Sequence, residues 1–204
     1  VLALKQWLKI HSENPVICVP SGNFGNICAG ILAHHRGLPV EHFIAACNVN
    51  DVVPEYLRTE ILQPKETVAT ISNAMDVGDP SNFVRILELF DKEFNQVKNK
   101  LSGYTIDDGE TLKTIERVEK DYGYVLDPHG AVAFVALEKY LAENGGKGFF
   151  LETAHPVKFP DSVEKATGKS VEIPKSLEEL MKQEKFTTEI NPQYEELKEF
   201  LLEK

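Results

Sequence analysis

One short run of small and polar residues in the sequence is suited to binding a phosphate group. It consists of Ser21, Gly22, Asn23, Phe24, Gly25 and Asn26. Its glycines permit unusual backbone dihedrals and a close approach of the main chain to a ligand. If a helix follows directly, the first free N–H groups of that helix and the positive end of its dipole face the same point. Phosphate accepts hydrogen bonds from such groups, so we expect an anion site at this loop.

The residues around this loop predict a strand before it and a helix after it. Residues 15–19 are apolar and rich in β-branched side chains, as is typical of a buried parallel strand. Residues 26–36 carry apolar side chains at helical spacing, and Gly37 follows as the expected C-cap. Together with a further strand at 41–47 they form a βαβ unit. We therefore predict an α/β fold with an open, mainly parallel sheet flanked by helices.

The remaining sequence predicts further helices, one more strand and a tail. Helices are expected at residues 2–12, at 83–100 with Ser81 or Asn82 as the cap, and at 110–121. Asp127 is expected to cap a helix that has Pro128 in its first turn, and residues 148–153 are expected to form a strand. Residues 1–170 are thus predicted to be an α/β domain, and residues 171–204 a charged helical extension.

Charge and cysteine content restrict the class of protein. A formal net charge of −10 argues against nucleic acid and against an anionic membrane as partners. The cysteines Cys18, Cys28 and Cys47 are odd in number and lack metal-ligand spacing, which predicts buried, reduced thiols, no metal site and a cytoplasmic protein. No apolar stretch approaches membrane-spanning length. Because the chain begins at Val1 with an uncapped helical stripe, we expect it to be cut from something longer.

Three polar clusters follow predicted strands, and each would lie at the carboxyl end of its strand. They are residues 21–26, residues 48–51 and residues 153–155. Ligands of open α/β sheets bind at this edge, so the clusters are expected to converge on one crevice. The dinucleotide fingerprint is absent, since Pro20 stands where its first glycine would be, but Asp51 is placed where a ribose-binding carboxylate would sit. A nucleotide-binding or other phosphate-binding module without catalytic activity therefore stays open as an alternative.

The candidate histidines and lysine each have a structural interpretation as well as a functional one. His155 is either a phosphate or substrate contact or a packed histidine bonded to nearby backbone. Lys158 is either a substrate-binding ammonium or an exposed lysine. We expect His129, beside a helix start, to be a cap contact and not a catalyst. His34 and His35 are adjacent on a helix and do not share a face, so they are poorly placed to bind a metal together.

Six ordered segments of the chain resemble the threonine synthase family, whose members are fold type II pyridoxal-phosphate enzymes. The resemblance extends from about residue 1 to 170. Its segments are Val19 to Asn26, Asn48 to Asp51, Ser72 to Val77, Ser81 to Phe83, Asp127 to His129 and Thr153 to Pro160. It implies a fold like that of the tryptophan synthase β subunit and a lyase that converts O-phosphohomoserine and water into threonine and phosphate, as a step of threonine biosynthesis.

The resemblance also implies roles for particular residues. The loop from Ser21 to Asn26 would hold the 5′-phosphate of pyridoxal 5′-phosphate, and Thr153 would lie beside its pyridine nitrogen. A neutral hydroxyl there favours an unprotonated ring nitrogen and so tunes the cofactor as an electron sink. His155 and Lys158 would be candidates for binding the substrate.

The family's Schiff-base lysine is missing from this chain. In the family that lysine lies in a segment before the position that corresponds to Val1, and Lys5, Lys9 and Lys158 stand in no comparable context. The resemblance therefore implies no catalytic residue in this chain. The missing amino-terminal part of the same enzyme becomes the expected partner, and this chain alone is expected to be inactive.

Overall fold

A computed structural model describes residues 2–184 and 186–202 of the chain. The chain divides into two compact units, Val1–Val171 and Glu172–Lys204. The first unit contains the sheet and the candidate site. The described part of the second unit contains α9 (Lys175–Met181) and α10 (Tyr194–Leu202), which begin shortly after Pro174 and Pro192. No helix within residues 2–184 and 186–202 is long and apolar enough to cross a membrane.

A parallel sheet of four strands lies at the centre of the first unit. The strand order is β3 (Leu101–Thr105), β2 (His42–Cys47), β1 (Val16–Pro20) and β4 (Gly148–Phe150). β1 pairs in parallel with β2 and with β4, and β2 pairs in parallel with β3. β1 and β2 are buried along their whole length, as their apolar sequences predict. The predicted open, parallel α/β sheet is confirmed.

The larger hydrophobic core covers one face of the sheet. Side chains alternate along a strand, so Ile17 and Val19 of β1 and Phe43 of β2 point to this face. Five helices contribute buried residues to the same core: α1 (Leu2–Ile10), α2 (Gly25–His35), α3 (Val52–Thr59), α4 (Phe83–Leu89) and α5 (Phe94–Lys100). α2 presents Ile27 and Ile31 to this core. This packing holds the amino end of α2 next to the carboxyl end of β1.

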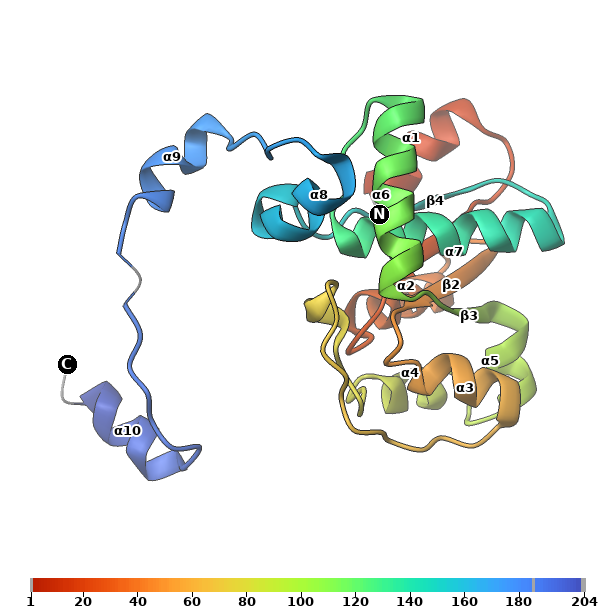
Figure 1. The fold of residues 1–204 in the computed structure, drawn as a ribbon. Helices are drawn as coiled ribbons and strands as arrows, with labels where there is room; N and C mark the ends of the chain where they lie inside the picture. Colours follow the sequence, from red (N-terminus) through yellow and green to blue (C-terminus); the bar gives the residue numbers. More distant parts are fainter. Residues whose placement is uncertain (1, 185, 203–204) are drawn as a thin grey trace. The chain divides into compact units, whose positions relative to one another are not determined.

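The opposite face of the sheet packs against α7 (Pro128–Asn144), which lies on the other side of the strands from α3, α4 and α5 (Figure 1). Val16 and Cys18 of β1 meet Val132 and Ala136 of α7 in this second core. α6 (Asp108–Tyr122) and α8 (Pro160–Thr167) pack together beside α7 and share a third cluster with it. Asp127 caps α7 as predicted, since its side chain accepts a hydrogen bond from the His129 N–H at 2.8 Å.

The single helix predicted for residues 83–100 is wrong. The structure has two helices there, α4 and α5, because Asp91 and Lys92 adopt left-handed backbone conformations with φ of 53° and 60°. Such conformations are rare for residues other than glycine and interrupt a helix. Asn82 occupies the N-cap position of α4, as predicted, but its side chain makes no capping hydrogen bond.

Two further differences concern the strands and one concerns a cysteine. β3 was not predicted, because the polar residues Ser102 and Thr105 obscure an edge strand that is defined by its pairing with β2. β4 ends at Phe150, three residues before the end predicted for that strand. All three cysteines are free, but Cys28 is only partly buried, whereas Cys18 and Cys47 are fully buried.

Candidate functional site

The loop between β1 and α2 turns sharply at Phe24. This residue has φ 62° and ψ 14°, a left-handed conformation that is unusual for a bulky side chain. Its ring is buried and packs edge-on against Phe83, with the ring centroids 5.6 Å apart. The apolar core therefore maintains a backbone conformation that the loop would not adopt alone. α2 begins at the next residue, Gly25, as predicted within one residue.

The backbone N–H groups of residues 22–27 are free of protein acceptors within the part of the chain that the structure describes. The flanking N–H groups are bonded: Ser21 donates to the Ala46 carbonyl at 2.8 Å and Cys28 to the Phe24 carbonyl at 3.0 Å. Free donors at a helix start, combined with the helix dipole, favour an anion.

Two side chains from the start of α4 bind Asn23 and fix the outer part of the loop. The Ser81 hydroxyl donates to Asn23 Oδ1 at 2.9 Å, and Asn82 Nδ2 donates to the Asn23 carbonyl at 2.9 Å. The residues predicted to cap a helix thus bind the candidate loop. With its Oδ1 accepting from Ser81, the Asn23 side chain keeps both N–H donors of its amide for a ligand.

A pocket of about 300 Å³ opens beside this loop. It is lined by Pro20, Gly22, Asn23, Phe24, Gly25, Asn26, Ala74, Met75, His129 and Thr153. Thr153 comes from the segment after β4, which is the parallel neighbour of β1. Five of the six predicted loop residues and Thr153 therefore share one pocket at the carboxyl edge of the sheet. Its lining contains neither lysine nor arginine, so an anion bound here would be held by neutral donors.

The wall of the pocket opposite the loop is the short 3-10 helix η1 (Asn73–Met75). A Cβ atom added to Gly22 would lie 2.6 Å from the Met75 Cα and 3.0 Å from the Ala74 carbonyl oxygen. Only glycine fits at position 22 without moving backbone, because real Cβ contacts are not this short. The loop and η1 are thus in direct contact, and together they define the pocket.

A network of buried and half-buried polar side chains holds the residues on both sides of η1. Asp76 Oδ1 accepts from Asn48 Nδ2 at 2.8 Å and from the Thr70 hydroxyl at 2.7 Å, while Asp76 Oδ2 accepts from the Thr70 N–H at 2.9 Å. Asn50 Nδ2 donates to Asp76 Oδ1 at 3.2 Å and to the Val68 carbonyl at 2.8 Å. Asn48 and Asn50, expected to face the crevice directly, are absent from the pocket lining and bind the segment that carries its wall.

His129 reaches the pocket from the first turn of α7 and has only 2% of its surface exposed. Its Nδ1 lies 2.7 Å from Asp127 Oδ1, and its Nε2 accepts a hydrogen bond from the Ala74 N–H at 3.2 Å. The cap contact expected for this region is present, and in addition His129 touches η1, 55 residues away in sequence. The only sign of this contact with η1 in the sequence was that Asp127 to His129 is one of the six segments that resemble the family.

The other predicted site residues lie elsewhere. The Ser21 hydroxyl donates to the Val19 carbonyl at 2.9 Å, and Ser21 is absent from the pocket lining. His155 and Lys158 are exposed and also absent from the lining, and His155 Nδ1 accepts from the Val157 N–H at the start of η2 (Pro156–Lys158). Asp51 binds Lys65 Nζ at 2.8 Å and the Thr105 hydroxyl at 3.1 Å. Both Asp51 carboxylate oxygens thus already bind other side chains, and Asp51 is absent from the pocket lining, which disfavours a ribose-binding role.

Glu152, directly before Thr153, is a titratable group near this site that sequence reasoning missed. A Cβ atom added to Gly130 would lie 1.6 Å from Glu152 Oε1, so the carboxyl group rests against the first turn of α7. Burial of this carboxyl group, together with the negative charge of Asp127, raises the pKa of Glu152 to about 7. Within residues 2–184 and 186–202, no cluster of three or more metal-binding side chains occurs.

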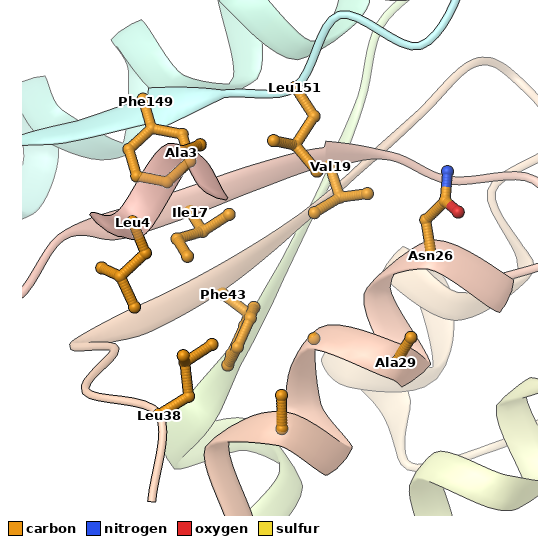
Figure 2. Close-up of a pocket in the computed structure, with 12 residues that line it drawn as sticks. Ala3, Leu4, Ile17, Val19, Asn26, Ala29, Leu38, Phe43, Phe149 and Leu151 are labelled. Carbon is orange, nitrogen blue, oxygen red and sulfur yellow. The ribbon is translucent and has the colours of Figure 1, made fainter. Parts of the chain in front are cut away.

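A second pocket, of about 230 Å³, is apolar and lies under α1 on the larger core (Figure 2). Leu4, Phe43, Phe149 and Leu151 point into it, and Asn26 at the start of α2 is the one polar side chain among the residues that line it. The side chains that line this pocket therefore provide apolar contacts but few hydrogen-bonding groups.

Two models of known protein families match overlapping parts of the chain. The model described as pyridoxal-phosphate dependent enzyme matches residues 4–149, and the model described as threonine synthase, C-terminal, matches residues 130–201. The first match includes the loop, η1 and His129, and the second includes Thr153 together with the carboxyl-terminal segments that follow it.

Individual relatives agree with these matches. The threonine synthase of Buchnera aphidicola subsp. Schizaphis graminum is 46% identical over 194 residues, which cover 94% of this chain and 44% of that protein. The crystal structure of threonine synthase from Escherichia coli superposes with a TM-score of 0.86 at 41% identity, covering 96% of this chain and 46% of that chain. A threonine synthase from Brucella melitensis with bound PLP gives a TM-score of 0.85 at 29% identity, covering 98% and 48%. The chain thus spans less than half the length of each of these three relatives.

Proposed function

The chain belongs to the family of pyridoxal-phosphate dependent enzymes, and from this premise we propose that it is the carboxyl-terminal portion of a threonine synthase and holds the cofactor phosphate. The observation that carries the proposal is the run of N–H groups without a protein acceptor at residues 22–27, of which residues 22–26 line a pocket together with Thr153. A pocket of about 300 Å³ is at the lower end of the size range of small-molecule sites.

The phosphate fits this loop by hydrogen bonding and not by ion pairing. The chain carries a net charge of −10, and the pocket lining has no basic side chain other than His129, whose ring nitrogens are both engaged. Backbone N–H groups and the helix dipole supply the positive potential in place of basic side chains. The close approach of Gly22 to Met75 requires a glycine at position 22. This supports the fit, because the backbone of the loop carries no side chain at that position.

Thr153 is the residue that we assign to the pyridine nitrogen of the cofactor. It lies in the same pocket as the loop, after the strand adjacent to β1, so both groups can reach one ligand. A hydroxyl can donate a hydrogen bond to an unprotonated nitrogen. Pyridoxal 5′-phosphate supplies the chemistry of an electron sink for carbanions, and a neutral partner at this nitrogen tunes that property.

The complete reaction, O-phosphohomoserine and water to threonine and phosphate, needs residues beyond this chain. A lysine amine must bind the cofactor and move protons, and no lysine lines the pocket within residues 2–184 and 186–202. We assign that amine to the part of the relatives' length that this chain does not cover. His155 and Lys158 follow Thr153 closely and are proposed as substrate contacts from outside the pocket. The free state of Cys18, Cys28 and Cys47 suits a cytoplasmic location.

Binding and activity measurements together test this function. In the whole protein, pyridoxal 5′-phosphate is expected to bind much more tightly than pyridoxal, and inorganic phosphate is expected to compete with it. The whole protein is expected to release phosphate from O-phosphohomoserine, whereas the 204-residue chain with added cofactor is expected to release none. Equal binding of pyridoxal with and without its phosphate would contradict the loop assignment, and turnover by the 204-residue chain would place the amine within it. Binding of a nucleotide in place of the cofactor would support the non-catalytic alternative.

A further inference from the structure

We propose that Asp127 and His129 form a positioning pair that holds η1 in place as the wall of the phosphate pocket. The proposal deepens the proposed function and rests on it in one respect, namely that the anion in the pocket is the cofactor phosphate. The hydrogen bonds that carry it are independent of any ligand. They join the amino end of α7 to a turn that the sequence places 55 residues earlier.

The contacts of His129 determine which of its ring nitrogens carries the proton. The Ala74 N–H is only a donor, so His129 Nε2, 3.2 Å away, must present its lone pair. The proton of the neutral ring is then on Nδ1, which donates to Asp127 Oδ1 at 2.7 Å. Asp127 is fully buried and is therefore available to the ring but not to solvent. Asp127 thus sets the ring tautomer that His129 needs in order to accept from Ala74.

Asp127 does more than a helix cap requires. A cap needs one oxygen, and Asp127 Oδ1 provides it by accepting the His129 N–H at 2.8 Å. Its second oxygen, Oδ2, is buried without a hydrogen-bond partner in the described part of the chain. Serine or threonine would cap the helix without burying such an atom. The carboxylate is therefore better explained by its bond to the His129 ring.

The hydrogen bond to Ala74 matters because η1 is in direct contact with the loop, so a shift of η1 changes the pocket. Ala74 and Met75 line the pocket, and Met75 already lies against Gly22. The Asp76 network holds the carboxyl end of η1, and His129 holds its middle. Without His129 the Ala74 N–H has no protein acceptor among the described residues, and η1 is free to move away from the loop. Because both ring nitrogens are engaged, His129 acts on the pocket by position and not as an acid or base.

The test compares two ways of releasing the Ala74 N–H in the whole protein. His129→Phe keeps a ring of similar size but removes the acceptor. Asp127→Ser keeps a good helix cap but is too short to hold the ring. Both are expected to weaken binding of pyridoxal 5′-phosphate about tenfold, as expected for one lost hydrogen bond that shapes a site. His129→Gln, whose side-chain oxygen can take the place of Nε2, is expected to restore most of the affinity.

Asp107→Ser is the matched control, because Asp107 caps α6 through the Glu110 N–H and contacts no histidine ring. It should leave cofactor affinity unchanged. A second readout needs no cofactor: hydrogen exchange of the peptide covering residues 72–76 should be faster in His129→Phe and Asp127→Ser, and unchanged in Asp107→Ser.

The possible outcomes separate this inference from the proposed function. Unchanged exchange at residues 72–76 in both pocket variants would overturn the positioning role, whatever the cofactor does. Faster exchange with unchanged cofactor affinity would also overturn it, because the wall would then not matter for the pocket. If the unsubstituted protein fails to bind pyridoxal 5′-phosphate, the proposed function fails, and faster exchange would still support the hydrogen bond as the anchor of η1.

Discussion

Gly22 and Met75 approach each other so closely that a Cβ atom at position 22 would lie 2.6 Å from the Met75 Cα. This contact joins the loop after β1 to η1, which are separated by a helix, a strand and α3 in the sequence. Backbone on both sides of the contact is held, by Phe24 packing on one side and by the Asp76 network on the other. The pocket therefore lies between two segments, the loop after β1 and η1, that are each held in place by the rest of the fold.

Gly22→Ala is expected to lower the free energy of unfolding by about 1–3 kcal/mol, the range for inserting an atom where the surroundings cannot yield. Gly25→Ala is the control in the same loop, since its Cβ would meet Asn82 Nδ2 at an ordinary 3.6 Å. We expect the control to change stability by less than about 0.5 kcal/mol. Chemical denaturation of both variants measures the difference, and equal stability would show that the loop and η1 can separate freely.

The parts of the site that the sequence predicted are those determined by local chemistry. The β-branched run before Ser21, the glycines of the loop and the cap at Asp127 each act within a few residues, and the structure has the predicted elements at all of these places. Sheet topology then placed Thr153 next to the loop, as expected for strands that end at one edge.

The parts that the sequence did not predict depend on contacts between distant residues. The bond from Ala74 to His129 spans 55 residues and leaves no periodic pattern. Asn48 was expected at the crevice because it ends a strand, but its amide is used by Asp76, 28 residues later. The break between α4 and α5 lies at Asp91 and Lys92. Both residues have left-handed conformations, but neither is a glycine, so the sequence carries no signal for the break. In each case tertiary context overrides the local preference.

Asp76→Ala is expected to be destabilising, because within the described residues the Thr70 N–H has no acceptor other than Asp76. Asn48 Nδ2, the Thr70 hydroxyl and the Thr70 N–H all donate to this carboxylate. Asn48 Nδ2 keeps the hydroxyl oxygens of Thr70 and Ser72 as acceptors, and the Thr70 hydroxyl can turn to Ser72, so one unsatisfied donor remains and a loss of about 1–3 kcal/mol is expected. The exposed Asp79 provides the control, and Asp79→Ala should shift the thermal midpoint little. A small loss in Asp76→Ala would mean that water replaces the carboxylate.

His42 is expected to make the fold less stable in acid. Burial of the ring, with a smaller contribution from Lys100, lowers the pKa of His42 from 6.5 to about 4. Between these values the folded state binds fewer protons than the unfolded state, so the contribution is complete above pH 6.5 and is lost as the pH falls toward 4. In His42→Gln the loss of unfolding free energy from pH 7 to pH 5 should be smaller than in the parent. An unchanged slope in His42→Gln would refute the assignment.

Gly130→Ala tests a contact that looks prohibitive and is expected to be mild. The new Cβ would lie 1.6 Å from Glu152 Oε1, but that oxygen is the far end of a flexible side chain, which can turn away toward solvent. Alanine is also better than glycine inside a helix by about 1 kcal/mol, so stability should be unchanged or slightly higher. Displacing the carboxyl group should return its pKa from about 7 toward 4.5.

The raised pKa of Glu152 makes stability depend on pH in the direction opposite to that given by His42. With its pKa raised, Glu152 binds a proton more tightly in the folded state, so the stability it contributes is present below pH 4.5 and is lost as the pH rises toward 7. Gly130→Ala and Glu152→Gln should both flatten this part of the stability profile. If Gly130→Ala unfolds the protein while Glu152→Gln does not, the first turn of α7 is less tolerant than the geometry indicates.

Thr153 variants in the whole protein separate phosphate binding from tuning of the cofactor ring. In the proposed site the loop at residues 22–27 binds the phosphate without help from Thr153, so Thr153→Val should retain cofactor affinity within about threefold, less than the value of one typical hydrogen bond. The loss of the hydroxyl should nevertheless lower the rate of phosphate release from O-phosphohomoserine by about tenfold or more and shift the absorption maximum of the bound cofactor. Thr153→Ser keeps the hydroxyl and should preserve both the rate and the spectrum. A Thr153→Val protein with the parental spectrum and rate would exclude Thr153 from the ring site, because a side chain beside the pyridine nitrogen must affect the electronic state of the ring.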